Sequence, residues 1–305
     1  MAGRAYATCT KCNRTFSKFS MIRVDKNNRG GNPAYICDDC NTEMHSYNTK
    51  NNKLRGADTV HPFTFGMENE TTYSDAKARS ELYEYDMLPT HDGTVDVEYK
   101  SCIEMSLKSF SHLWKVMDKL IAEGHMEIGD SAGSHFHVGH RNLNSETIEY
   151  IRRFYHSLFT GLSNEMKLHP EETKKLFGRE IDHYNESGRC WARSIDENTD
   201  PENHTNFINV QHSRTLEFRM AKFKNSEQYT KMAKFATKVT DCVMTNFVEH
   251  FNDEVDINKL KRNWKLNFNE DIEISERNAQ RMYRLFKAKM TSKKLVNLYI
   301  KAIER

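Results

Sequence analysis

Four segments of the chain alternate between ionisable and apolar side chains with the two-residue period of a β-strand. They span residues 63–70, 95–99, 133–139 and 214–220. In the first segment, Phe65 and Met67 fall on one side of the extended chain. Glu68 and Glu70 share the other side, roughly 7 Å apart along the strand. Two carboxylates this close repel each other unless a cation lies between them, so the segment indicates a binding face more than a solvated edge strand.

The other three segments repeat this arrangement. Their ionisable members are Glu98 in the second, His135 and His137 in the third, and Glu217 and Arg219 in the fourth. Any one such strand can arise by chance. Together they predict a sheet with one face packed on helices and the other lined by carboxylates, imidazoles and a guanidinium.

Amphipathic stretches between these segments predict helices. We expect helices to begin at Ser111, Ser145 and Ser226, and two further helices to lie between Ser275 and Arg305. Their methionine and aromatic stripes indicate core packing. The fold class is therefore α+β: a largely antiparallel sheet with helices on one face.

The cysteines at the start of the chain form two C-x-x-C pairs. The pairs are Cys9 with Cys12 and Cys37 with Cys40, whereas Cys102, Cys190 and Cys242 stand alone. An odd total with two pairs argues against a disulfide framework and predicts four thiolates on one structural Zn²⁺, about 2.3 Å from each sulfur. A redox C-x-x-C pair is the alternative, although no βαβ pattern surrounds either pair.

We expect two domains: a zinc-ribbon module with its linker at 1–55, and a large domain at 56–305. The boundary is placed near Arg55, in a stretch rich in turn formers. Basic and aromatic residues in the ribbon fit a nucleic-acid surface. They equally fit a solvated face over a small aromatic core, or a docking module, and the sequence leaves these alternatives open.

Net charge and hydropathy exclude some classes of function for this chain. Lys and Arg total 45 against 43 Asp and Glu, which excludes a strongly basic nucleic-acid coat as the role of the whole chain. No run of about 18 apolar residues occurs, and the first part of the chain contains no apolar block of a signal peptide. We expect a soluble, cytoplasmic protein that does not bind membranes.

The ionisable face suits divalent metals and phosphate. The carboxylates of Glu68, Glu70, Glu98 and Glu217 are hard oxygen ligands, which suit Mg²⁺ or Mn²⁺. Several of them on one face suggest more than one ion. Arg219 can neutralise a phosphoryl group, while His135 and His137 can ligate metal, contact phosphate or move protons. No Gly-Lys-Ser or Gly-Lys-Thr occurs, so a nucleotide would be held by metal and side chains on the sheet.

The ordered motifs resemble those of the amidoligase family. They read FGMENE at 65–70, DGT at 92–94, VEYKS at 97–101, SHFHVG at 134–139 and TLEFR at 215–219. The family typically shows F-G-x-E-x-E, D-G-S, V-E-I-x-S-P, H-x-H-V-G and T-x-E-F-R in this order. The resemblance covers residues 63–224. Thr94 replaces the usual Ser and keeps a hydroxyl, and Cys102 stands where Pro is usual.

The resemblance implies a glutamine-synthetase-like sheet and ATP-dependent formation of an amide or isopeptide bond through an acyl phosphate. It assigns Glu68, Glu70, Glu98 and Glu217 to the metals, Arg219 to phosphate, and His135 and His137 to the nucleotide or metal site. It also assigns Asp92 to the incoming amine. Small molecules, peptides or protein side chains can supply the acid and the amine, and some relatives assemble into rings.

Other interpretations stay open. A metal-dependent hydrolase could use His135 and His137 with Glu217. A thiol enzyme could use Cys190 with His183, and a nucleic-acid-binding ribbon could sit on a ligase-like scaffold without activity. Arg189 and Arg193 either clamp a substrate carboxylate or phosphate, or form surface salt bridges.

Overall fold

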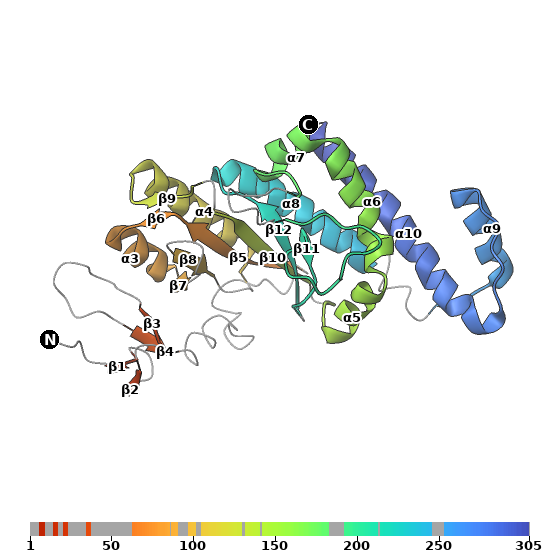
Figure 1. The fold of residues 1–305 in the computed structure, drawn as a ribbon, viewed down its shortest axis with the longest axis horizontal. Helices are drawn as coiled ribbons and strands as arrows, with labels where there is room; N and C mark the ends of the chain where they lie inside the picture. The colour runs from red at the N-terminus through yellow and green to blue at the C-terminus, as the bar shows by residue number, and fades with distance from the viewer. Residues whose placement is uncertain are drawn as a thin grey trace.

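The computed structural model of the 305-residue chain is drawn in Figure 1. The structure describes residues 6–9, 15–17, 21–23, 35–37, 63–85, 87–90, 97–101, 105–129, 132–140, 142–182, 192–212, 214–245 and 253–304. None of the helices in these ranges has the length and apolar character needed to cross a membrane.

The largest sheet among the described residues has six strands, in the order β11-β12-β10-β5-β8-β7, with antiparallel pairing throughout. The strands are β5 (Phe63–Thr71), β7 (Leu88–Thr90), β8 (Val97–Lys100), β10 (Ser134–His140), β11 (Ile208–Asn209) and β12 (Thr215–Ala221). A small separate sheet pairs β6 (Tyr73–Ser74) with β9 (Met126–Glu127). The prediction of an antiparallel sheet containing all four alternating segments is confirmed, because these segments form β5, β8, β10 and β12.

Two helices cover the apolar face of this sheet. Helix α4 (Leu107–Ala122) packs on β5, and α8 (Ser226–Val243) packs on β10 and β12 (Figure 1). Trp114 of α4 meets the ring of Tyr229 of α8, with centroids 3.6 Å apart. Phe136 stacks on Phe218 across the sheet at 5.3 Å. Each such fully buried aromatic contributes about 2 kcal/mol or more relative to exposure, so this layer anchors the strands.

Helix α3 (Ala76–Glu84) packs against β7 at one edge of the sheet, and the other remaining helices lie beyond its opposite end (Figure 1). These other helices are α5 (Ser145–Arg153), α6 (Tyr155–Leu168), α7 (Pro170–Phe177), α9 (Ile257–Phe268) and α10 (Glu276–Ile303). Helix α10 packs along α6 and α8, and α9 folds back against the other end of α10 (Figure 1). Leu260, Trp264 and Phe286 form a small second core there.

The C-terminal segment is one helix, so the prediction of two helices between Ser275 and Arg305 is wrong. Residues 276–303 contain neither Gly nor Pro. The polar Thr291 in the middle does not interrupt the helix, because its hydroxyl donates to the carbonyl of Lys287 one turn earlier, at 2.9 Å. Conversely, the single helix expected from Ser145 onward ends at Arg153, and a second begins at Tyr155.

Helices α5 and α8 begin at Ser145 and Ser226, as predicted, whereas α4 begins earlier than Ser111, at Leu107. The side chain of Ser106, not Ser111, caps α4 by accepting a hydrogen bond from Ser109 N. Asn144 and Asn225 cap α5 and α8, each one residue before the serine expected to begin the helix. Asn caps a helix as well as Ser does, and the sequence offers both side by side.

The N-terminal module is described only in short strands. Strand β1 (Tyr6–Thr8) pairs with β2 (Thr15–Ser17), and β3 (Met21–Arg23) pairs with β4 (Tyr35–Cys37). Cys9 is buried, and its backbone bridges to Tyr35 of β4. Cys12, Cys40 and the boundary near Arg55 lie outside the described residues, so the zinc ribbon and the domain division stay predictions.

Asp75 gives a test of local stability. Its carboxylate accepts a hydrogen bond from Ala78 N at 2.9 Å and lies 2.8 Å from His125 Nδ1. Burial alone would raise the pKa of Asp75, but these hydrogen bonds lower it below 3.8. The stabilisation is therefore present above pH 3.8 and is lost as the pH falls through the lowered pKa.

We expect Asp75→Ala to reduce the free energy of unfolding by about 1 kcal/mol at neutral pH.

Urea unfolding of the wild type and the variant across the acid range checks this. The difference between them should shrink at acid pH, and Asp75→Asn, which keeps a capping oxygen, should lose less than Asp75→Ala at neutral pH. A difference that is constant with pH would contradict the role of the charge.

Candidate metal centre

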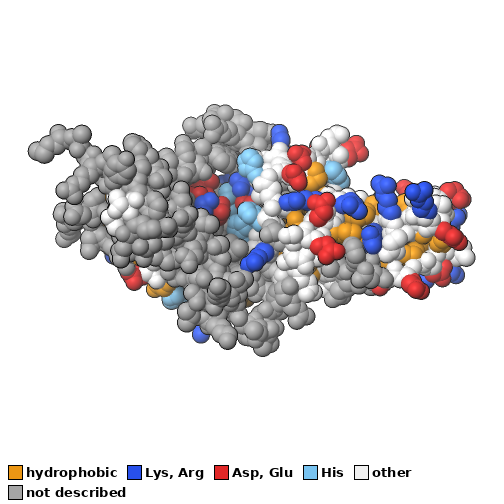
Figure 2. Space-filling model, turned by 90° about the horizontal axis from the view of Figure 1, so that it is seen from below, with side chains coloured by type: hydrophobic (Ala, Val, Ile, Leu, Met, Phe, Trp, Pro, Cys, Tyr) orange, Lys and Arg blue, Asp and Glu red, His pale blue; other side chains and the backbone are white. Residues whose placement is uncertain are grey.

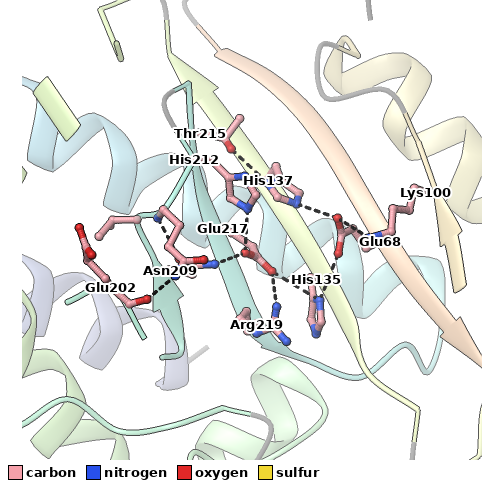
Figure 3. Close-up of polar contacts among 12 residues, drawn as sticks. Glu68, Lys100, His135, His137, Glu202, Asn209, His212, Thr215, Glu217 and Arg219 are labelled. Atoms are coloured by element: carbon pink, nitrogen blue, oxygen red, sulfur yellow. Dashed lines mark hydrogen bonds and ion pairs between the residues drawn. The ribbon is translucent and has the colours of Figure 1, made fainter. Parts of the chain in front are cut away.

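The ionisable side chains of four neighbouring strands meet on the face of the sheet opposite α4 and α8. Strand register places them directly opposite one another: His135 faces Glu68, His137 faces Glu217, and Lys100 faces Glu68. Directly opposed residues in antiparallel strands have Cβ atoms about 5 Å apart. Figure 2 shows acidic, basic and histidine side chains gathered near the middle of one face of the molecule, and Figure 3 shows the contacts among them.

Glu68, Glu98 and His135 form the first group of potential metal ligands, which we call the Glu68 group. One ligand atom from each lies within 4.8 Å of the others. The ammonium of Lys100 lies between the two carboxylates, 3.2 Å from Glu68 Oε1 and 3.0 Å from Glu98 Oε2. The Glu68 group therefore already binds a cation, supplied by the chain itself.

His137, His212 and Glu217 form the second group, which we call the Glu217 group. Their ligand atoms also lie within 4.8 Å of one another. The imidazoles of His137 and His212 are nearly perpendicular, with centroids 4.8 Å apart, and His212 Nε2 lies 3.2 Å from Glu217 Oε2. Two imidazoles and a carboxylate suit Zn²⁺, Mn²⁺ or Fe²⁺.

The Glu68 group and the Glu217 group adjoin each other, and the side chains of His135 and His137 contact both. His135 Nδ1 is 3.6 Å from Glu68 Oε2 and 3.4 Å from Glu217 Oε1. His137 Nε2 points back toward Glu68, with 3.8 Å to Oε1. This arrangement can hold two divalent ions side by side, as in sites that act on phosphates.

Neighbouring side chains fix the orientation of the Glu217 group. Thr215 Oγ1 lies 3.1 Å from His137 Nδ1, which leaves Nε2 to face the group. Asn209 Nδ2 donates to Glu217 Oε2 at 2.5 Å, and Arg219 Nη1 donates to Glu217 Oε1 at 2.7 Å. A hydrogen bond to the other ring nitrogen is how proteins orient a metal-ligating histidine.

Several buried nitrogen atoms on this face have no hydrogen-bond partner within the part of the chain that the structure describes. They are Nδ1 and Nε2 of His135, Nε2 of His137 and Nε of Arg219. An unsatisfied buried polar atom costs about 1–3 kcal/mol. His135 is only 3% exposed, so bulk water does not offset that cost. The donor set and these atoms fit a bound divalent metal with an anionic ligand.

The carboxylates of Glu68 and Glu217 are anionic at neutral pH. Burial alone would raise the pKa of Glu68, but its contacts with His135 and His137 hold that pKa well below its ordinary value. Burial would likewise raise the pKa of Glu217, but the contact with His212 and the neighbouring cationic groups lower it strongly. Both carboxylates therefore reach a metal without first losing a proton.

Glu70 lies on the same face but outside both groups. Its carboxylate accepts a hydrogen bond from Gly133 N at 2.5 Å, at the end of β5. The guanidinium of Arg179, which is 3% exposed, also lies beside Gly133. The two-residue step from Glu68 carries Glu70 about 7 Å along the strand, toward Arg179.

Arg193 is the one remaining substrate-binding candidate that the structure describes. Arg193 is exposed, and its backbone bridges to Asn206. Asp92, Arg189 and Cys190 lie outside the described residues, so their predicted roles stay predictions.

Three residues of the face were missed from the sequence: Lys100, Asn209 and His212. Lys100 had a visible signal, because it follows Glu98 by two residues and so shares its face. Asn209 lies opposite Glu217 only because β11 pairs with β12. His212 lies between these strands and has no periodic signal, so tertiary pairing alone places it.

Fold and site together define a mixed α/β protein with a candidate two-metal centre on an antiparallel sheet. Comparisons with protein-family models, with curated proteins and with solved structures give no match for this chain. The geometry and chemistry of the face are therefore the basis on which its function is inferred.

Thr215 gives a test of the centre. Thr215→Val removes the hydroxyl beside His137 Nδ1 while keeping the side-chain shape, so the imidazole loses its fixed orientation. We expect the affinity for Mn²⁺ at the Glu217 group to fall by about tenfold, as judged by isothermal titration calorimetry. Thr215→Ser keeps the hydroxyl and should bind as the wild type does. Equal affinity in the valine and wild-type proteins, with unchanged thermal unfolding, would contradict the orienting role.

Proposed function

We propose that the chain is an ATP- and divalent-metal-dependent carboxylate–amine ligase, which forms an amide or isopeptide bond through an acyl phosphate. The observation that carries the proposal is the pair of adjoining ligand groups, with Lys100 and Arg219 beside them, on one face of an antiparallel sheet. The motif order that resembles the amidoligase family supports the same assignment.

The charge balance of the face favours a polyanionic ligand. The carboxylates of Glu68, Glu98 and Glu217 outnumber the fixed cations Lys100 and Arg219. With divalent ions in both groups the balance becomes positive, which suits a triphosphate more than a neutral substrate. Mg²⁺ or Mn²⁺ would bring the γ-phosphate and the substrate carboxylate together despite their mutual repulsion.

The reaction requires positioning more than covalent chemistry from the chain. A carboxylate oxygen of the acid attacks the γ-phosphorus and ADP leaves; the amine nitrogen then attacks the acyl carbon, phosphate leaves and the amine loses a proton. Arg219 donates through Nη1 to Glu217, and its buried Nε has no partner among the described residues, so the guanidinium can bind a phosphoryl oxygen. The side chains of His135 and His137 lie between the Glu68 group and the Glu217 group, where they can contact both metal ions.

Turnover of ATP tests the ligase proposal. With Mg²⁺, ATP, a panel of carboxylic acids and hydroxylamine as a general amine, the protein should release ADP and form a hydroxamate with the correct acid. Glu68→Gln and Arg219→Ala should each reduce the rate by about a hundredfold or more, because each removes charge at the reacting phosphate.

Glu123→Gln is the matched control. Glu123 forms an exposed ion pair with Lys77 away from this face, so its loss should leave turnover unchanged. Unaltered turnover in both Glu68→Gln and Arg219→Ala would remove the ligase assignment.

A metal-dependent hydrolase is the second candidate. The observation that favours it is the Glu217 group itself, since two histidines and one carboxylate form a common catalytic zinc site. A hydrolase would cleave esters or amides without nucleotide, and Zn²⁺ would restore the activity after chelation. A ligase would instead require ATP for every turnover.

We further propose a structural Zn²⁺ bound by Cys9, Cys12, Cys37 and Cys40. The support is local: Cys9 is buried and bridges to Tyr35, two residues before Cys37 in β4. A module this short needs metal to fold. Such a module can also contact a nucleic acid or another protein.

Zinc analysis tests this proposal. We expect one Zn²⁺ per chain by mass spectrometry of the metal content, and loss of that ion in Cys9→Ser. Cys242→Ser in α8, remote in sequence from the C-x-x-C pairs, should retain it. Full zinc content in Cys9→Ser would contradict the four-cysteine site.

A further inference from the structure

Lys100 already offsets part of the negative charge of the Glu68 group. Its Nζ lies 3.2 Å from Glu68 and 3.0 Å from Glu98, and these carboxylates supply two of the three ligand residues of that group. The sheet enforces the contact, because Lys100 stands directly opposite Glu68 on the neighbouring strand and shares its face with Glu98. A metal ion bound through the two oxygens that Lys100 contacts, Glu68 Oε1 and Glu98 Oε2, would have to occupy the space that the ammonium now holds.

We propose that Lys100 is an internal counter-cation that competes with metal at the Glu68 group, so that divalent ions bind to the Glu217 group first. The inference rests on the proposed function only in requiring both groups to bind metal. It adds an order of metal binding and a residue that controls it.

The two groups differ in how their cations are held. The Lys100 side chain is 30% exposed and carries its ammonium on a flexible four-carbon stem. The ammonium can therefore turn toward solvent when an ion arrives. Arg219, in contrast, is only 12% exposed and contacts Glu217 through Oε1. Oε2 of Glu217 lies near His212 and accepts its other hydrogen bond from the neutral amide of Asn209, so the guanidinium does not compete with a metal for that oxygen.

Buried imidazoles support metal binding at both groups. His135, in the Glu68 group, has no hydrogen-bond partner for either ring nitrogen among the described residues, and neither has Nε2 of His137 in the Glu217 group. Lys100 cannot satisfy an imidazole nitrogen while it donates to the two carboxylates. An ion that displaces Lys100 would gain this third ligand, which the ammonium does not use.

Mn²⁺ binding to the full-length, zinc-loaded protein tests the inference without any substrate. Calorimetry of the wild type should resolve one tight and one weak Mn²⁺, and electron paramagnetic resonance should show spin coupling only when the weak position fills. In Lys100→Met the weak class should tighten by about tenfold or more, because no ammonium has to leave. Lys100→Arg, which keeps a cation, should leave it weak.

Two control variants show which ligand group binds the tight Mn²⁺ and which binds the weak one. His212→Ala should remove the tight class while leaving the Glu68 group in place. Lys77→Met removes a lysine from an exposed ion pair with Glu123 and should change neither class. If Lys100→Met unfolds, Lys100→Gln provides the same measurement with a side chain that still donates a hydrogen bond.

The outcomes separate this inference from the proposed function. Identical Mn²⁺ binding in the wild type, Lys100→Met and Lys100→Gln would overturn the role of Lys100 and leave the ligase proposal standing. No Mn²⁺ binding in any of these proteins would overturn both. A weak class that tightens only when Lys100 is removed supports the order of binding.

Discussion

The pairing of β10 with its two neighbours is the constraint on which the site depends. Because β10 lies between β5 and β12, its register decides which carboxylate each histidine meets: His135 meets Glu68 and His137 meets Glu217. A shift of one residue would turn both histidines toward α8 and bring Phe136 to the polar face. The metal-ligand groups thus exist only in one register, and no single strand carries either group alone.

The apolar side of the sheet holds that register. Phe136 packs on Phe218, and Ser134 donates to Asn69 at 2.5 Å across the β10–β5 pair. An irregularity in β10–β12 pairing lies between Ser134 and Phe136, at His135, whereas His137 keeps its regular pairing with Glu217. Burial on this side offsets the cost of unsatisfied imidazoles on the other, as is common where a binding face is held ready for its ligand.

Period-two alternation was enough to predict the four central strands and most ionisable residues of their polar face, because side-chain direction in a strand is a local property. The same alternation also places Lys100 on the polar face, because Lys100 follows Glu98 by two residues. His212 is not placed in this way, since it belongs to no strand and approaches Glu217 only after β11 and β12 pair. The start of α4 was a different error, because the Ser106 cap is a local contact with Ser109 that the sequence offered. The continuous helix α10 packs against α6 and α9.

Helix α10 has a mechanical consequence of its own. Its 28 residues span about 42 Å, and it joins the main core, through Tyr299, to the small cluster around Phe286. Because this helix contributes residues to both cores, a displacement of the small cluster is passed along α10 to the α6–α10 packing.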